Sequence, residues 1–204
     1  MRHVDILFGI LYLGFFSMGL QLVGSRLLAP YFGSSLVVWA FLISTFLAAF
    51  SVGSIFGGWV SGLSPRRRRA GVWAILYLQI LSLAFTAVLG REFLRLVEAN
   101  FDSIAVGLVL ACPALFFLPI MMLSAFAPLS TEVLARRGLS AGLASGLIYG
   151  LSTVGNIAGV MATAFLLIPN FPISQLLIAW IFLIAPSLFY LARRILHPKE
   201  DSAM

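Results

Sequence analysis

The sequence predicts an all-α, polytopic membrane protein with about six transmembrane helices, in a single domain that covers residues 1–204. Of its residues, 61% are hydrophobic and only 10% are charged, against roughly 25% charged in soluble domains. Several apolar runs reach the roughly 20 residues that a helix needs to cross a bilayer. Cys112, His3 and His197 are the only residues of their types, and they offer neither a disulfide framework nor a cluster of metal ligands.

The first expected span covers residues 4–29. Its apolar stretch is too long for the hydrophobic region of a signal peptide, and no convincing cleavage site follows, so we expect it to be retained. Arg26 lies near its end, where a long basic side chain can reach the membrane interface. A stripe of small and polar residues follows one side of the helix: Gly14, Ser17, Gln21 and Gly24.

The second and third spans are expected at residues 36–62 and 70–90. Trp39 and Trp59 lie near the ends of the second span, where interfacial aromatic residues are common. A short basic loop with four consecutive arginines separates the two spans. After the third span, residues 91–102 are amphipathic, and this pattern favours a separate short helix that lies in the membrane interface.

The fourth span, residues 104–129, contains three prolines, which remove backbone hydrogen bonds and predict kinks. Glu132 follows it, four residues before Arg136, and we expect the two side chains to form a surface ion pair. The fifth span runs from residue 140 to about residue 168, and the sixth covers residues 173–191.

Orientation follows from the basic residues. With six spans and both termini on one side, ten of the thirteen Lys and Arg residues lie on that side, and only Arg26, Arg91 and Arg95 lie on the other. Because cytoplasmic segments carry the excess of Lys and Arg, we expect both termini in the cytoplasm. The net charge of +6 does not indicate nucleic-acid binding, since the basic residues stand at the ends of apolar runs.

The fifth span has a face of small and polar residues, and we expect the rest of the chain to be organised around this helix. Small residues four apart allow the backbone of another helix to approach closely, and we expect this role for Gly142, Gly146, Gly150, Gly155 and Gly159. Tyr149, Ser152 and Asn156 share one side of the same helix. Such a face is typical of a tight helix–helix seam, and it also suits one wall of a ligand site.

A polar pocket is expected where the first and fifth spans pack together. A carboxamide in an apolar span must find partners in a medium that supplies none. Gln21, Tyr149, Ser152 and Asn156 then converge near mid-membrane, with Arg26 above them. The pocket can serve structure alone or the binding of a ligand.

An internal repeat relates the two halves of the chain. Residues 51–57, Ser-Val-Gly-Ser-Ile-Phe-Gly, match residues 153–159, Thr-Val-Gly-Asn-Ile-Ala-Gly, and Gly53 and Gly57 thereby match Gly155 and Gly159. A second match pairs Ala29-Pro30 with Ala127-Pro128. Each unit, about residues 1–100 and 101–204, holds three spans, so the second is inverted relative to the first. Inverted repeats are typical of transporter folds, and this one resembles half of a major-facilitator fold.

Three motifs carry a resemblance to a known family. They are Ser-Arg-Leu-Leu-Ala-Pro-Tyr-Phe-Gly at residues 25–33, Gly57-Gly58, and Tyr-Gly-Leu-Ser-Thr-Val-Gly-Asn-Ile-Ala-Gly at residues 149–159. The chain resembles the membrane domain of bacterial spermidine-synthase-like membrane proteins, the fused major-facilitator/spermidine synthase family, over nearly its whole length. The resemblance implies a location in the bacterial inner membrane.

Two departures from the family pattern bear on function. An aminopropyltransferase-like domain commonly follows the membrane helices in that family, and nothing in these 204 residues resembles its glycine-rich loop or acidic residues. The family also commonly carries a glutamate just before the Ser-Arg-Leu-Leu-Ala-Pro run, where this chain has Gln21. A polyamine is a multiply charged cation, and a neutral residue here weakens the case for a polyamine site.

Two functions fit these observations. One is a transporter-like membrane module that binds a small polar or cationic solute, and six spans then require a homodimer for alternating access. The other is a non-catalytic membrane subunit that anchors or stabilises a separate partner protein. The spans contain no Ser/His/Asp set and no paired carboxylates, so we expect no enzyme activity and no cofactor or metal.

Overall fold

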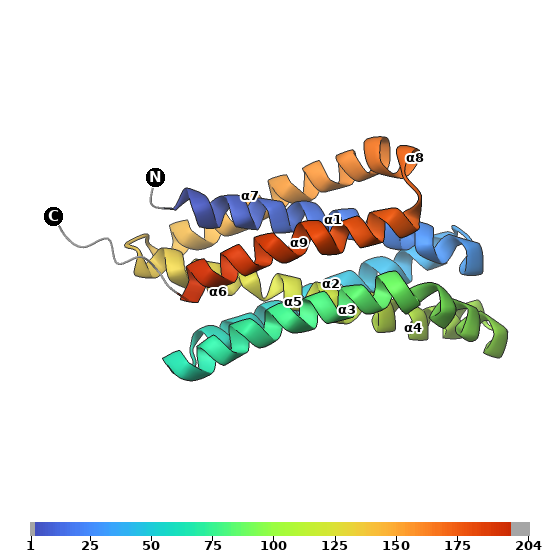
Figure 1. The fold of residues 1–204 in the computed structure, drawn as a ribbon, viewed down its shortest axis with the longest axis horizontal. Helices are drawn as coiled ribbons and strands as arrows, with labels where there is room; N and C mark the ends of the chain where they lie inside the picture. Colours follow the sequence, from blue (N-terminus) through green and yellow to red (C-terminus); the bar gives the residue numbers. More distant parts are fainter. Residues whose placement is uncertain (1–2, 197–204) are drawn as a thin grey trace.

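The protein, described here by a computed structural model over residues 3–196, is helical throughout, with no strand among these residues (Figure 1). Six units are long and apolar enough to cross a membrane, which confirms the predicted all-α polytopic class. The α-helices are α1 (Val4–Phe32), α2 (Leu36–Ser61), α3 (Pro65–Asn100), α4 (Ile104–Cys112), α5 (Leu118–Ser124), α6 (Phe126–Arg136), α7 (Ala141–Ala162), α8 (Ile168–Asn170) and α9 (Ile173–Leu196). Two π-helical turns, η1 (Pro113–Phe117) and η2 (Thr163–Leu167), join α4 to α5 and α7 to α8.

The six units alternate in direction. We call Ile104–Arg136 the fourth span and Ala141–Asn170 the fifth span. The start of α1, the end of α9, the α2–α3 turn and the α6–α7 turn all lie at one end of the bundle, which we call the inner end (Figure 1). The inner end carries eight of the described arginines: Arg66, Arg67, Arg68, Arg69, Arg136, Arg137, Arg193 and Arg194. Arg2 and Lys199, which we also expected there, lie outside the described residues.

The third span differs from the prediction. α3 is one helix of 36 residues, so the separate interfacial helix expected at residues 91–102 is wrong, and the four arginines form its first turns instead of a loop. The buried face continues through the expected boundary at Thr86, Gly90, Leu94 and Val97. At 1.5 Å per residue the helix is about 54 Å long, so it extends beyond a hydrocarbon core of about 30 Å.

Proline interrupts the fourth span as expected. Pro113 begins the π-helical turn η1, and Pro119 follows in the first turn of α5. Pro119 has no N–H to donate to the carbonyl of Leu115, four residues earlier. The hydroxyl of Thr86, on α3, donates to that carbonyl at 2.6 Å. A neighbouring helix thus satisfies the backbone group that the proline leaves free, as the apolar medium requires.

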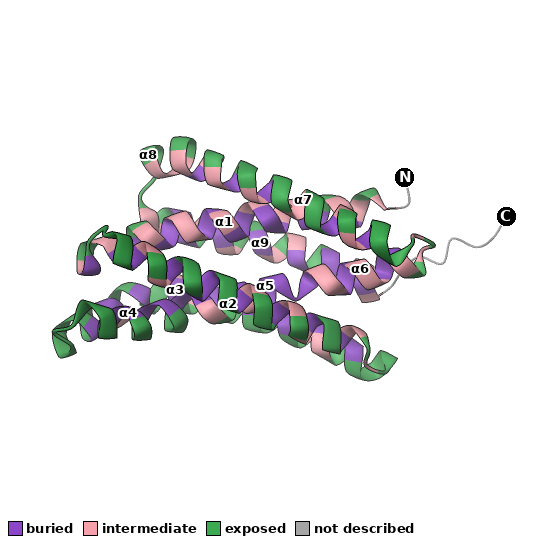
Figure 2. Ribbon diagram, turned by 180° about the vertical axis from the view of Figure 1, so that it is seen from behind, coloured by how far each residue is buried: buried purple, intermediate pink, exposed green. Residues whose placement is uncertain are grey.

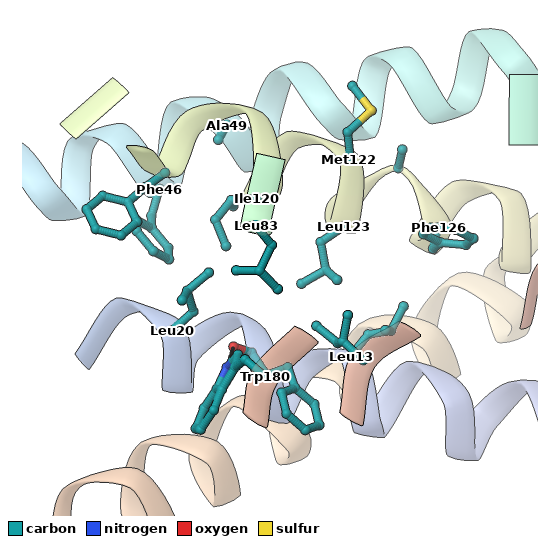
Figure 3. Close-up of a cluster of buried hydrophobic side chains, with 14 of the residues drawn as sticks. Leu13, Leu20, Phe46, Ala49, Leu83, Ile120, Met122, Leu123, Phe126 and Trp180 are labelled. Atoms are coloured by element: carbon teal, nitrogen blue, oxygen red, sulfur yellow. Dashed lines mark hydrogen bonds between the residues drawn. The ribbon is translucent and has the colours of Figure 1, made fainter. Parts of the chain in front are cut away.

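Apolar side chains fill the space between α1, the fourth span, α3 and α9 (Figure 3). Trp180 of α9 is buried, and its indole N–H donates to the Phe16 carbonyl of α1 at 3.1 Å. Its ring lies edge-on to the Phe16 ring, with the centroids 5.2 Å apart. α9 packs on α1 and α3, and α3 packs on α5, so α3 and α9 support α1 and α5 from one side of the bundle.

Glycines set the closest helix contacts, and they do so twice. A Cβ atom at Gly155 or Gly159 would overlap the backbone carbonyls of Leu11 and Phe15 on α1. On the other side of the bundle, a Cβ at Gly53 or Gly57 of α2 would overlap backbone atoms of the fourth span, at Met121 and Ala125 respectively. The second span thus contacts the fourth as the fifth contacts the first, with the same four-residue spacing on both helices. An inverted repeat, in which the first span corresponds to the fourth and the second to the fifth, requires these two contacts to correspond in this way.

The other three glycines of the fifth span do not pack within the chain. Nothing lies within 4 Å of a Cβ built at Gly142, Gly146 or Gly150, so their predicted role as packing residues is wrong for the single chain. Gly150 and Gly155 are five residues apart and therefore lie on different faces of the helix. The outer face of α7 is largely exposed (Figure 2).

Cysteines introduced at Arg67 and at Glu98 should react with a membrane-impermeant maleimide from opposite sides of the membrane, because the two ends of α3 lie at opposite ends of the bundle. With the inner end in the cytoplasm, Glu98→Cys labels in intact cells and Arg67→Cys labels only after permeabilisation. Cys112→Ala supplies the background, since the native thiol is buried. Labelling of both positions in intact cells would contradict this topology.

Gly155→Ala should lower the free energy of unfolding by about 1–3 kcal/mol or more, because the new methyl group meets a backbone that cannot move aside. Gly146→Ala is the matched control on the same helix. It enters open space and should leave stability unchanged or raise it by up to about 1 kcal/mol. Melting temperatures of the two purified variants provide the measurement, and equal values would refute the close-contact role of Gly155.

Candidate functional site

A groove lies between α2 and α7. α7 packs on α1 and α6, while α2 packs on α5 and α6, so α1 and the fourth span form the floor between two walls. The middle of the groove is a cavity of about 310 Å³, which we call the central cavity. Its lining comprises Ile10, Leu13, Gly14, Ser17, Met18, Leu47, Phe50, Ser54, Leu123, Ser124, Ala127, Ile148, Tyr149, Ser152, Thr153 and Asn156.

A hydrogen bond between floor and wall marks the polar side of this cavity. The Ser17 hydroxyl of α1 lies 3.0 Å from the carboxamide oxygen of Asn156 on α7, and 2.9 Å from the Gly14 carbonyl. Its single proton can serve one of these acceptors at a time. The carboxamide nitrogen of Asn156 has no hydrogen-bond partner among the described residues. It is therefore available to donate to a molecule in the cavity.

Further polar groups come from the other walls. Four residues with hydroxyl side chains also line the cavity: Ser54 of α2, Ser152 and Thr153 of α7, and Ser124 of the fourth span. The Thr153 hydroxyl donates to the Tyr149 carbonyl at 2.8 Å, and the Ser124 hydroxyl donates to the Met121 carbonyl at 3.0 Å. Pro128 follows Ser124 by four residues and cannot donate to its carbonyl, so this helical acceptor loses its usual partner. The lining thus offers mainly oxygen acceptors, with the hydroxyls of Ser54 and Ser152 as further donors or acceptors.

A smaller cavity of about 220 Å³ continues the groove toward the inner end. It shares Ser54, Ala127, Ile148 and Tyr149 with the central cavity, and it adds Ser61, Thr131, Glu132 and Ser145. Glu132 accepts a hydrogen bond from Arg136 at 2.7 Å, which confirms the ion pair expected from their spacing. An acidic side chain therefore stands beside the polar groove, at its inner mouth.

The structure brings together three of the five residues predicted for the polar pocket. Tyr149, Ser152 and Asn156 line the central cavity, and α1 contributes to it as expected. Gln21 does not, because the cavity ends at Ser17 and Met18, and Gln21 lies a turn farther along α1. Arg26 also lies outside it and lines a separate cavity near the outer end of the bundle. These two assignments to one pocket are therefore wrong.

Ser54 is a cavity residue that sequence reasoning missed, although the repeat held the signal. In the aligned motifs, Ser54 corresponds to Asn156. The two residues face the same cavity from opposite walls, α2 and α7. Gln79 is a further carboxamide to which the sequence pattern assigned no role; it lies in α3, is 1% exposed, and its side-chain oxygen has no partner among the described residues. Gln79 does not line the central cavity.

Comparison with known proteins assigns neither a family nor a function to the chain. No family model, curated protein or solved structure matches the chain. Within residues 3–196, no three His, Cys, Asp or Glu side chains lie close enough together to hold a metal ion. The described lining of the central cavity contains no charged side chain, histidine or cysteine. Its polar groups can form hydrogen bonds with a small molecule.

Water should reach the central cavity from the groove. Cysteines placed at Ser54 and Thr153 should react with a small water-soluble methanethiosulfonate reagent at least about tenfold faster than a cysteine at Ile157, because a thiolate forms readily in water but not in lipid. Ile157 lies on the same helix as Thr153 and is 57% exposed, but it does not line the cavity. Equal rates at the three positions would show that the cavity is not hydrated.

Proposed function

We propose that the chain is a transporter-like integral membrane module that binds a small polar or cationic solute in the central cavity. The observation that carries this proposal is the position of Ser54 and Asn156, which are equivalent in the repeat and line one cavity from opposite walls. In transporters built from inverted repeats, the substrate site lies near the middle of the membrane, where the repeats meet. The paired glycine contacts support such a repeat here.

The groups around the cavity favour a ligand that donates hydrogen bonds. Hydroxyl oxygens of the lining supply acceptors, and Glu132 places a carboxylate in the smaller cavity toward the inner end. Protonated amines meet both requirements, whereas the free Asn156 amide N–H needs an acceptor, which water or a polar atom elsewhere on the solute supplies. The motif resemblance to spermidine-synthase-like membrane proteins agrees with this class of solute, but Gln21 in place of the glutamate common in that family weakens the case for a polyamine.

The proposed location is the bacterial cytoplasmic membrane, with the inner end in the cytoplasm. The excess of arginines at that end supports this orientation. Six spans leave the groove between α2 and α7 open along one side, and a second copy of the chain would close it. The proposed working unit is therefore a homodimer with two facing grooves.

A second candidate function is a non-catalytic membrane subunit that anchors a partner protein. The exposed glycines of α7, Gly142, Gly146 and Gly150, favour it, because small residues four apart allow a helix of another chain to approach closely. The fifth span also has only 17% of its apolar window buried within the chain. Under this proposal the partner covers α7, and the central cavity is structural.

Binding in the central cavity should raise the melting temperature of the detergent-purified protein when spermidine or putrescine is added at constant ionic strength. A ligand at 100 times its Kd stabilises by about 2.7 kcal/mol. Asn156→Leu should abolish this shift while changing the basal stability by roughly 1 kcal/mol. Gln21→Leu is the control, a carboxamide of α1 outside the cavity, and should keep the shift.

Two results would contradict the transporter proposal. One is the absence of a shift with amines, amino acids and neutral polar solutes alike. The other is an equal loss of the shift in both variants, which would mean that the cavity does not hold the ligand. Co-purification of a partner protein in one-to-one ratio, released by Gly146→Leu, would support the subunit function instead.

A further inference from the structure

The cavity that contains Arg26 is separate from the central cavity. It has a volume of about 310 Å³ and lies near the outer end of the bundle, between the last turns of α1, the first turn of α2 and the end of the fifth span. It shares no lining residue with the central cavity. Its lining comprises Leu22, Ser25, Arg26, Ala29, Ser34, Val38, Trp39, Ala164 and Ile168.

Arg26 is the charged residue of this lining, and no acidic side chain among the described residues forms an ion pair with it. The described acidic residues at the outer end lie on α3 or directly after it, and one of them, Glu92, is paired with Arg95. Arg26 is exposed near the end of α1, so its guanidinium can be solvated at the membrane interface by water or by an anion. The cavity leaves room for an anion beside the guanidinium.

The first turn of α2 adds donors and positive potential at the same place. The Ser35 hydroxyl caps the N–H of Val38, which leaves the N–H groups of Leu36 and Val37 without a side-chain cap. The first turn of α2 contains no acidic residue. A helix N-terminus carries a partial positive charge, so the start of α2 and Arg26 both favour an anion in the cavity that they line. The Ser34 hydroxyl lines the same space.

We propose that this cavity binds the phosphate group of an anionic phospholipid from the outer leaflet. A guanidinium matches phosphate geometry and binds two of its oxygens at once. The apolar lining from Leu22, Ala164 and Ile168 suits the glycerol and first acyl carbons, and Trp39 has the indole ring typical of the headgroup level. A net negative headgroup is preferred over a zwitterionic one, because both fixed charges of the site are positive.

The test measures lipid retention and melting temperature of the purified protein with phosphatidylglycerol and with phosphatidylcholine. The native chain should retain phosphatidylglycerol through delipidation and melt several degrees higher with it. Arg26→Gln should weaken phosphatidylglycerol binding at least tenfold, and Arg26→Lys should recover part of it. Arg91→Gln is the matched control, an exposed arginine at the same end that lines neither cavity, and should bind within twofold of the native chain.

Three outcomes would overturn the proposal. Equal losses in Arg26→Gln and Arg91→Gln would show a diffuse charge effect instead of a site. Equal protection by inorganic phosphate or glycerol 3-phosphate would show that the ligand is a soluble anion. If Arg26→Gln does not fold, Ser34→Asp provides the second variant. It places a carboxylate in the cavity, is compatible with the start of α2, and should also weaken phosphatidylglycerol binding at least tenfold; unchanged binding would refute the site.

Discussion

The fold depends on two close helix contacts in which backbone meets backbone. In a bilayer, apolar side chains gain little by leaving lipid for protein, so helices associate where small residues allow dense packing. Gly155 and Gly159 bring α7 against α1, and Gly53 and Gly57 bring α2 against the fourth span. Each wall of the groove is thereby fixed to a different floor helix. The central cavity is the space that remains between these two pairs.

The repeat connects this packing to the site. The motif that supplies the contact glycines also supplies Ser54 on one wall and Asn156 on the other, each one residue beyond the first contact glycine. Close packing on one side of each helix therefore fixes a polar side chain near the cavity on an adjacent side. The second match, Ala29-Pro30 with Ala127-Pro128, does not share this register. The glycine contacts make Leu11 of the first span equivalent to Met121 of the fourth span. Ala29 lies eighteen residues after Leu11, but Ala127 lies only six residues after Met121, so the two pairs are not equivalent in this alignment.

Local sequence signals predicted the six spans, their alternation and the charge difference between the two ends, because hydropathy and basic residues act segment by segment. These local signals failed where contacts between distant residues determine the end of a helix or the face that it buries. The charged face after Gly90 favoured a separate helix, but the buried stripe through Leu94 and Val97 continues α3. Spacing alone also could not separate Gly150, which faces open space, from Gly155, which meets α1. The same limit applies to Gln21, because one helical turn decides whether a residue on that stripe reaches the cavity.

The open side of the groove places a constraint on the working protein. Tyr149 lines the central cavity and is 66% exposed, and Thr153, a turn away, is exposed as well. Polar groups at this depth destabilise the protein when they face hydrocarbon, and they are tolerated where they face water or protein. Lipid filling the groove would leave the Tyr149 hydroxyl and the Asn156 amide N–H without partners, whereas the Thr153 hydroxyl already donates to the Tyr149 carbonyl at 2.8 Å. A hydrated groove covered by another protein surface provides hydrogen-bond partners for these groups.

Both proposed functions supply such a protein surface, either from a second copy of the chain across the groove or from a partner that packs on α7. The amide of Asn156 distinguishes the two, because a purely structural pocket would be expected to satisfy the donor that this cavity leaves free.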